Sequence, residues 1–185
     1  VLLITFSLCF FIFQGNGTVV RFKLVGENYI VDWVRNVQGR VDNYFYNGNG
    51  GLTHVLQSDG ELQEGSTWEA LMSASHYRLG NLTAIVDRNR IQLDGWTEET
   101  MTLEPVNKRF EAFGWHVQEI DGHDLSQIHD ALLKTHEIGP KEHKPCAIIA
   151  HTVKGKGISF MEDQVKWHGV APNDDELERA LKELE

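Results

Sequence analysis

The sequence predicts an α/β protein with three layers, in which helices cover both faces of a mainly parallel β-sheet. Short apolar runs that suit strands alternate with helix-like segments from residue 52 onward. Strands that are separated by helices form parallel sheets through right-handed crossovers. Gly80 and Gly114 fall where two of the helices are expected to end. These observations indicate one doubly covered sheet.

The strands are predicted from apolar runs, and the helices from apolar residues on one face with capping residues at their starts. The predicted strands are 53–57, 83–87, 116–120 and 147–152. The predicted helices are 64–79, 105–114, 124–135 and a last one that begins at Asn173 with Glu176 three residues later. The run "TAIVD" at 83–87 is apolar enough for a strand that is buried on both faces.

The first fifty residues are expected to form a divergent or truncated N-terminal segment (1–50), followed by one domain (51–185). The segment lacks helical periodicity and ends in "NYFYNGNGG", which is typical of a loop. Its opening "VLLITFSLCFFIF" is short for a membrane span. The same run has the hydrophobicity of a signal-peptide core, but no basic segment or initiator Met precedes it. A buried strand and a truncated chain start are the open alternatives.

The charge of the chain argues against whole classes of partner. The formal net charge is -10, from 27 acidic and 17 basic residues, and this excess repels a phosphate backbone. Lys154 and Lys156 make the one compact basic spot in the sequence, and a solvated loop is the simpler interpretation. Two cysteines are too few for a disulfide framework. We expect a cytoplasmic protein that binds neither nucleic acid nor membrane.

Polar residues follow two of the predicted strands, at the ends where ligands of parallel sheets bind. Asp59 and Asn89 supply a carboxylate and an amide oxygen, which suit Mg²⁺ or Ca²⁺ better than zinc. Gly60 allows close approach of a phosphate, and the helix after it offers free N–H groups. The pattern indicates a diphosphate bridged by Mg²⁺. The alternative is that Asp59 and Glu61 cap a helix while Asn89 makes a turn.

Three segments in order resemble one enzyme family. The first is "SDGELQEGSTWEALMSASHYRLGNLTAIVDRNRIQLDG", which is similar to the thiamine diphosphate motif of transketolases; "FEAFGWHVQEIDGHD" and "HTVKGKGISFMED…WHG" resemble the segments that follow it. The likeness covers about residues 55–185 and is greatest for the stand-alone N-terminal subunit of split transketolases. It implies the thiamine diphosphate-binding fold and, within it, the module that grips the diphosphate.

The resemblance assigns roles to individual residues. Asp59 and Asn89 match Mg²⁺ ligands, and Ile91 matches the position whose backbone carbonyl is the third ligand. Gly60 matches a contact to the diphosphate. His168, in "KWHG", matches a histidine near the diphosphate and the reacting carbonyl. The implied cofactors are thiamine diphosphate and Mg²⁺, for which Ca²⁺ can substitute.

The resemblance also implies a partner and a reaction. Glu64 matches a glutamate at the subunit interface, so we expect a homo- or hetero-oligomer. The pyrimidine-binding module, which the C-terminal transketolase subunit carries, is expected as the partner. The implied reaction transfers a two-carbon ketol unit between sugar phosphates of the pentose phosphate pathway. The chain is thus expected to be a transferase of the transketolase type that is incomplete by itself.

Two departures from the family keep alternatives open. Ser58 stands where the family has glycine, and it would be strained if that position required positive φ. Residues 1–50 show no match to the His-Pro and Gly-rich loops of the family. A remnant that binds cofactor or partner without turnover is therefore the second hypothesis. A ketoacid dehydrogenase component is a third, which the segments "WHG" and "IDGHD" disfavour.

Other conspicuous residues are expected to serve the fold. We expect His116 and His123 to pack or to make surface hydrogen bonds. We expect Trp68 and Met72 to lie in the core or in an interface. Turn and cap chemistry is expected of Asp121 and Asp124.

Overall fold

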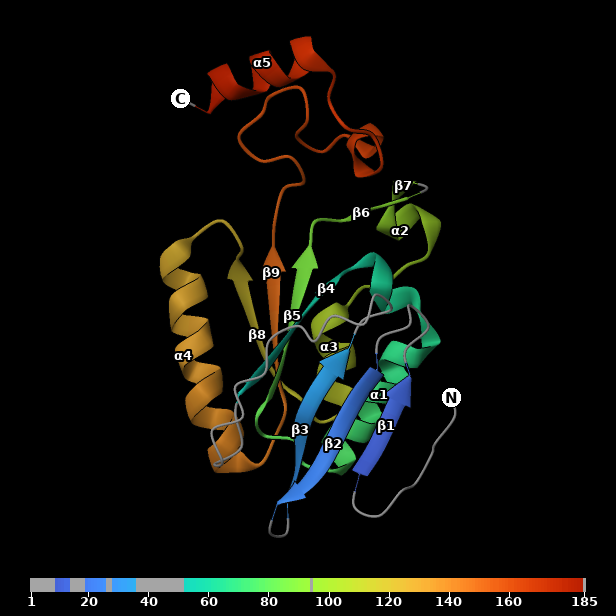
Figure 1. The fold of residues 1–185 in the computed structure, drawn as a ribbon, viewed down its shortest axis with the longest axis vertical. Helices are drawn as coiled ribbons and strands as arrows, with labels where there is room; N and C mark the ends of the chain where they lie inside the picture. The colour runs from blue at the N-terminus through green and yellow to red at the C-terminus, as the bar shows by residue number, and fades with distance from the viewer. Residues whose placement is uncertain (1–8, 14–18, 26–27, 36–51, 94, 185) are drawn as a thin grey trace.

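The computed structural model describes residues 9–13, 19–25, 28–35, 52–93 and 95–184 (Figure 1). The loop predicted from "NYFYNGNGG" falls at 43–51 and lies outside the described residues, as does the chain start at 1–8. No helix among the described residues has both the length and the apolar character that crossing a membrane requires.

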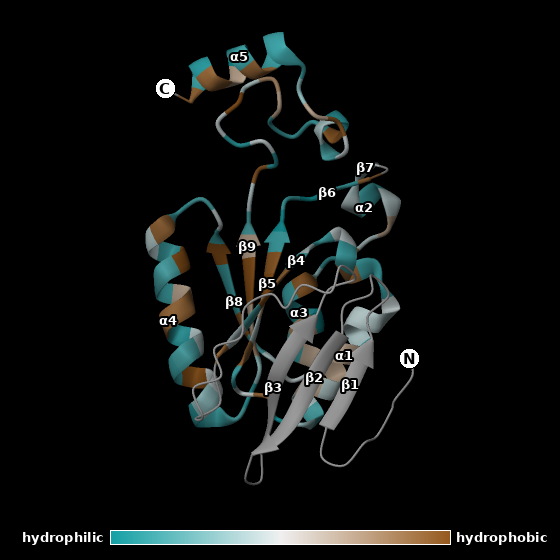
Figure 2. Ribbon diagram, in the orientation of Figure 1, coloured by the Kyte–Doolittle hydropathy of each residue, from teal (hydrophilic) through white to brown (hydrophobic). Residues whose placement is uncertain are grey.

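A four-stranded parallel sheet forms the centre of the molecule. Its strands are β4 (Thr53–Ser58), β5 (Leu82–Arg88), β9 (Cys146–His151) and β8 (His116–Asp121), in the order β4-β5-β9-β8. Every neighbouring pair is parallel. All four strands were predicted to within one residue at each end. Figure 2 shows β5 and β9 brown along most of their length, as expected for strands buried on both faces.

Helices cover both faces of this sheet, which confirms the predicted α/β class (Figure 1). The longer helices are α1 (Gly65–His76), α3 (Val106–Ala112), α4 (Leu125–Glu142) and α5 (Asp174–Glu183). The short elements are η1 (Gly60–Gln63), α2 (Thr97–Thr100), η2 (Val165–His168) and the hairpin of β6 (Ile91–Gln92) with β7 (Gly95–Trp96). The short elements were not predicted, because two to four residues carry too little periodicity.

The main hydrophobic core lies between the sheet and helices α1 and α3. Phe110 of α3 is fully buried, and its ring meets the ring of Trp115 edge-on. The Trp68 indole stacks with Phe113 and donates its N–H to the Leu62 carbonyl at 2.7 Å. Trp68 therefore packs against the core, as expected. Met72 does not, since its side chain is 54% exposed.

Helix α4 covers the opposite face, and near its carboxyl end its backbone contacts the turn that precedes β5. A Cβ atom built on Gly139 would lie 2.2 Å from the Gly80 carbonyl oxygen, so the two backbones are in direct contact. The helix extends to Glu142, seven residues beyond the predicted end at Thr135, and this extension includes Pro140. The contact between the two glycines gives this last part of α4 a packing partner that its own sequence does not indicate.

Capping chemistry matches the sequence prediction at two helices. The Asp124 carboxylate accepts hydrogen bonds from the backbone N–H groups of Ser126 and Gln127 at the start of α4. Asn173 and Glu176 form a reciprocal capping box at the start of α5. The side chain of Asp121 accepts the His123 backbone N–H at 2.9 Å, which is the turn chemistry expected of it.

A second sheet lies in the N-terminal segment. Strands β1 (Cys9–Phe13), β2 (Val19–Val25) and β3 (Asn28–Arg35) pair antiparallel in the order β1-β2-β3. Residues 9–13 of the apolar opening run therefore form a strand, and the burial that the sequence alternative expected of it stays a prediction. The antiparallel sheet was not predicted, and the division of the chain at residue 50 stays a prediction.

The close approach of Gly80 and Gly139 leads to a stability prediction. Gly139→Ala is expected to lower the free energy of unfolding by about 1–3 kcal/mol, because the added methyl group must push two backbones apart. Gly65→Ala in α1 is the matched control, since nothing lies within 4 Å of its added Cβ. Urea unfolding of the two variants measures the difference. Equal stability of both variants would contradict the packing described for α4.

Two histidines give stability a pH dependence. His54 Nε2 lies 3.0 Å from His136 Nε2, and burial, then the neighbouring His136, lower the pKa of His54 below its ordinary 6.5. Burial, then the charge of Lys134, lower the pKa of His116, although Glu142 opposes this. The unfolded chain takes up protons near pH 6.5 that the folded chain resists, so stability falls as the pH drops through that value.

The expected result is a free energy of unfolding that declines between about pH 7 and pH 5. The decline is shallower in the double variant His54→Gln/His116→Gln, and unchanged in His129→Gln, whose side chain is exposed on α4. Denaturant unfolding over this pH range tests the prediction. An unchanged slope in the double variant would show that other groups cause the decline.

Candidate functional site

Backbone hydrogen bonds bring the ends of all four parallel strands to one edge of the sheet. The Asp59 N–H, just past β4, donates to the Asp87 carbonyl of β5 at 3.2 Å. The Thr152 N–H, just past β9, donates to the Arg88 carbonyl at 3.3 Å. The Gly122 N–H, just past β8, donates to the carbonyl of His151 at 2.8 Å. The residues that follow the strands therefore share one edge.

Asp59 is fully buried at this edge, and its two carboxylate oxygens have different surroundings. Oδ2 accepts two hydrogen bonds, from Nη1 of Arg88 at 2.7 Å and from the Arg90 backbone N–H at 2.6 Å. Oδ1 is buried and has no hydrogen-bond partner among the described residues. A buried carboxylate oxygen without a donor is costly unless a cation binds it. The structure thus leaves one oxygen of Asp59 suited to a metal ion.

Asn89 follows β5 directly, between Arg88 and Arg90, which both donate to this carboxylate, and it is 7% exposed. Its Nδ2 donates to Oδ2 of Asp87 at 3.1 Å, and its Oδ1 accepts the backbone N–H of Ile91 at 3.0 Å. This is turn chemistry, as the alternative interpretation expected. An amide oxygen has two acceptor sites, so one remains for a cation. Asn89 therefore fits both interpretations.

The chain between Asn89 and Ile91 is held in an uncommon conformation. Arg90 has φ of 68°, in the left-handed region that is uncommon for residues other than glycine. That conformation directs its backbone N–H to Oδ2 of Asp59. The side chain of Ile91 is 1% exposed, which fixes the start of β6. Asp59 thereby sets the path of the segment that contains the two other predicted ligand residues.

The donor set at this edge suits a hard divalent cation. Among the described residues, no three His, Cys, Asp or Glu side chains come together as a metal-binding group. The predicted set instead combines one carboxylate, one amide oxygen and one backbone carbonyl. Mg²⁺ is commonly bound by one or two carboxylates while its other positions hold phosphate oxygens and water.

The turn after β4 shows what Ser58, Glu61 and Glu64 do. Ser58 is not among the described residues with positive φ, so it is unstrained. Oε2 of Glu61 accepts the Ser58 N–H at 2.8 Å, which confirms Glu61 as part of the helix start. Glu64 precedes α1 and is exposed. Gly60 opens η1, where an added Cβ would lie 3.3 Å from the Cβ of Gln92.

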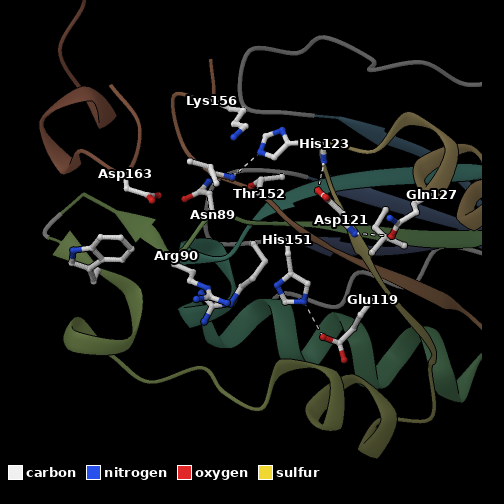
Figure 3. A pocket seen from close by; sticks show the side chains of 14 residues that line it. Asn89, Arg90, Glu119, Asp121, His123, Gln127, His151, Thr152, Lys156 and Asp163 are labelled. Carbon is white, nitrogen blue, oxygen red and sulfur yellow. Dashed lines mark hydrogen bonds and ion pairs between the residues drawn. The ribbon is translucent and has the colours of Figure 1, made fainter. Parts of the chain in front are cut away.

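A cavity of about 720 Å³ opens over the ends of β5, β8 and β9 and includes Asn89 in its lining (Figure 3). On one wall, Nε2 of His123 accepts the Val153 N–H at 2.8 Å. On another, Nε2 of His151 lies 2.9 Å from Oε2 of Glu119. The hydrogen bond to His123 is the role the sequence indicated for it. His116, by contrast, has a buried Nε2 without a partner among the described residues.

His168 is exposed and ends η2. The element η2 packs beside β6, which begins at Ile91. The structure therefore brings the turn that carries His168 to the segment that carries two of the predicted ligands, although more than seventy residues separate them in sequence.

The buried cation at the site was not predicted. The Arg88 side chain is 1% exposed and contacts three carboxylates, those of Asp59, Glu98 and Glu104. Burial alone would lower the pKa of Arg88, but hydrogen bonds to Asp59 and Glu104 raise it on balance. Burial would raise the pKa of Glu104, but the hydrogen bonds from Arg88 and the Val106 N–H, together with the charges of Arg88 and Arg90, lower it on balance. The one sign in the sequence that Arg88 is buried was its position in "VDRN", at the end of an apolar strand.

Comparison with known proteins identifies the family. The family model "Transketolase, thiamine diphosphate binding domain" matches residues 14–184. The chain belongs to the transketolase family. The match begins inside the segment 1–50, which resembled no family loop, and it covers nearly the whole chain. The predicted family and its thiamine diphosphate-binding domain are therefore confirmed.

Individual relatives agree with this assignment. The chain is 45% identical over 132 residues to an apulose-4-phosphate transketolase subunit of Phocaeicola vulgatus, covering 71% of this chain and 46% of that protein. It is 40% identical over 131 residues to human transketolase, of which it covers 20%. The crystal structure of Campylobacter jejuni transketolase superposes with a TM-score of 0.66 and 35% identity over 71% of this chain and 20% of that one. The chain thus spans about half the length of the relative from Phocaeicola vulgatus.

Asp87 links two neighbouring strands at this edge through a side-chain hydrogen bond that can be tested by mutation. Its Oδ1 accepts the Thr152 hydroxyl, which joins the ends of β5 and β9. Thr152→Val is expected to lower the free energy of unfolding by about 1–2 kcal/mol, because a carboxylate loses its donor. Thr100→Val is the control, since that hydroxyl donates to a backbone carbonyl on the exposed surface. Unfolding curves that are equal for the two variants would contradict a structural role for Asp87.

Proposed function

We propose that this chain binds thiamine diphosphate through Mg²⁺ at the carboxyl edge of its parallel sheet. One observation carries the proposal: the buried Oδ1 of Asp59 has no partner among the described residues, and the other oxygen of this carboxylate accepts the backbone N–H of Arg90, the residue that follows Asn89. The family of the chain is defined by a thiamine diphosphate-binding domain, which supports the same cofactor.

In this proposal, Asp59 and Asn89 bind Mg²⁺ through their side-chain oxygens, and Ile91 through its backbone carbonyl. Ca²⁺ is expected to substitute, because it takes the same hard oxygen ligands. Gly60 lets the backbone approach the diphosphate, and its position at the start of η1 agrees with that role. The cavity beside Asn89 offers room for the diphosphate and the water that completes the shell of the metal.

The proposed reaction is the transfer of a two-carbon ketol unit between sugar phosphates. Thiamine diphosphate supplies the carbanion and electron-sink chemistry when it is bound. His168 is proposed to hydrogen-bond the oxygen of the reacting carbonyl, where negative charge develops. Its exposed position on η2, beside β6, supports access to a substrate.

A partner chain is part of the proposal. The relative from Phocaeicola vulgatus is named as one subunit of a transketolase, and this chain covers about half of it. A second subunit would carry the pyrimidine-binding module and complete the cofactor site. Glu64 is proposed to lie at the interface with that second chain, because its exposed position before α1 leaves it accessible.

Calorimetry of thiamine diphosphate binding, with the partner subunit supplied, tests the binding site. Heat is expected in the presence of Mg²⁺ and is expected to be lost in Asp59→Asn, which removes the negative charge but keeps the shape of the side chain. Asp130→Asn, on the exposed surface of α4, is the matched control and should bind like the wild type. Absence of any Mg²⁺-dependent heat in the wild type would overturn the binding proposal.

A coupled assay on xylulose 5-phosphate and ribose 5-phosphate, with the same partner, tests turnover. His168→Asn is expected to lower kcat by roughly 10²-fold or more, the usual contribution of a positioned acid–base group, while cofactor binding persists. Unchanged turnover in this variant would remove His168 from the proposed chemistry. Cofactor binding without any turnover in the wild type would favour the non-catalytic binding module instead.

A further inference from the structure

Arg88 carries one positive charge and contacts three carboxylates. Its Nη1 lies 2.7 Å from Oδ2 of Asp59, and its Nη2 lies 2.7 Å from Oε1 of Glu98 and 2.9 Å from Oε1 of Glu104. Its Nε lies 3.2 Å from the same Glu104 oxygen. Three carboxylates therefore face one guanidinium, and the group as a whole carries excess negative charge.

This excess matters for the proposed Mg²⁺ site, on which the inference rests. A guanidinium paired with Asp59 alone would neutralise the carboxylate that is proposed to attract the cation. Opposite charge next to a metal ligand weakens its hold on the metal. Since Arg88 is 1% exposed and Asp59 0%, water does little to screen this pair. A buried arginine beside a metal ligand therefore needs other anions to balance its charge.

Backbone hydrogen bonds hold Glu98 and Glu104 in positions where they balance the charge of Arg88. Oε1 of Glu98 also accepts the backbone N–H of Leu103 at 3.1 Å. Oε2 of Glu104 accepts the N–H of Val106, at the start of α3, at 3.0 Å. Both carboxylates are thus oriented by backbone donors as well as by Arg88. They are 34% and 48% exposed, so they are held at the rim of the site rather than inside it.

The two oxygens of Asp59 complete the arrangement. Arg88 and the Arg90 N–H occupy Oδ2, which leaves Oδ1 as the oxygen without a donor. Turning the plane of the carboxylate would break both bonds, so Arg88 and the Arg90 N–H together fix its orientation. A side chain that orients a metal ligand in this way commonly changes metal affinity ten- to hundredfold, roughly, when it is removed.

We propose that Arg88, Glu98 and Glu104 form a positioning cluster in which Arg88 orients Asp59 and the two glutamates balance the charge of Arg88, so that the site as a whole still attracts a cation. The segment 97–106 is thereby coupled to metal affinity without touching the metal. The cluster involves residues that the family resemblance did not single out.

The test measures the Mg²⁺ Kd of the variants by calorimetry. Mg²⁺ is titrated into the chain in the presence of thiamine diphosphate and the partner. Glu98→Gln and Glu104→Gln are each expected to raise the Mg²⁺ Kd roughly three- to tenfold, less than loss of a direct support because both side chains act through Arg88. Glu99→Gln is the matched control: it removes the same charge from the next residue of α2, and Glu99 makes no ion pair among the described residues.

A double-mutant cycle separates action through Arg88 from a general effect of charge. In an Arg88→Met background, Glu104→Gln is expected to lose most of its effect on the Mg²⁺ Kd. If Arg88→Met does not fold, the comparison of Glu98→Gln and Glu104→Gln with Glu99→Gln still decides. Unfolding midpoints are measured in parallel, because a purely structural role would lower the midpoint and leave the Kd unchanged.

The outcomes are distinguishable. A wild type without Mg²⁺-dependent heat defeats the proposed function itself. A wild type that binds Mg²⁺, with Glu98→Gln and Glu104→Gln binding equally well, overturns the positioning cluster alone. Equal weakening by Glu99→Gln also overturns it, since bulk charge would then explain the result.

Discussion

The arrangement of the whole sheet edge depends on the buried ion pair between Arg88 and Asp59. It joins the end of β4 to the end of β5, and through Glu98 and Glu104 it reaches the start of α3. A buried pair of this kind adds little net stability, because desolvation offsets the attraction. Removing one partner is costly, at about 3–5 kcal/mol, since a charge is left unpaired. The pair therefore acts mainly to specify one arrangement of the edge.

Much of the fold was predictable because its signals are local. The strands β5 and β9 are continuous apolar runs, and Asp124 and Asn173 mark helix starts through bonds to residues two or three positions away. The end of α4 was not predictable in this way. It depends on Gly80, which is distant in sequence and contacts Gly139 only once the chain has folded.

In the candidate site, too, the residues with local sequence signals could be predicted and those defined by distant contacts could not. Asp59 and Asn89 could be picked out because each follows a strand, and parallel strands end at a common edge. The role of Arg88 could not, because it is defined by Glu98 and Glu104, which approach it only through the turns between β6 and α3. Ser58 illustrates a third case: the sequence left open whether this position is strained, and the structure shows an unstrained residue bonded to Glu61.

One oxygen of Asp59 serves the fold, through Arg88 and the Arg90 N–H, while the other has no partner among the described residues and is the one proposed to bind a ligand. If the proposed metal site is correct, a substitution of this aspartate disturbs both the chain path and the bound cation. A descendant that had lost its cofactor would still be under pressure to keep the residue, because its chain path after β5 depends on it. The presence of this aspartate in a related chain would therefore not by itself show that the chain binds a cofactor.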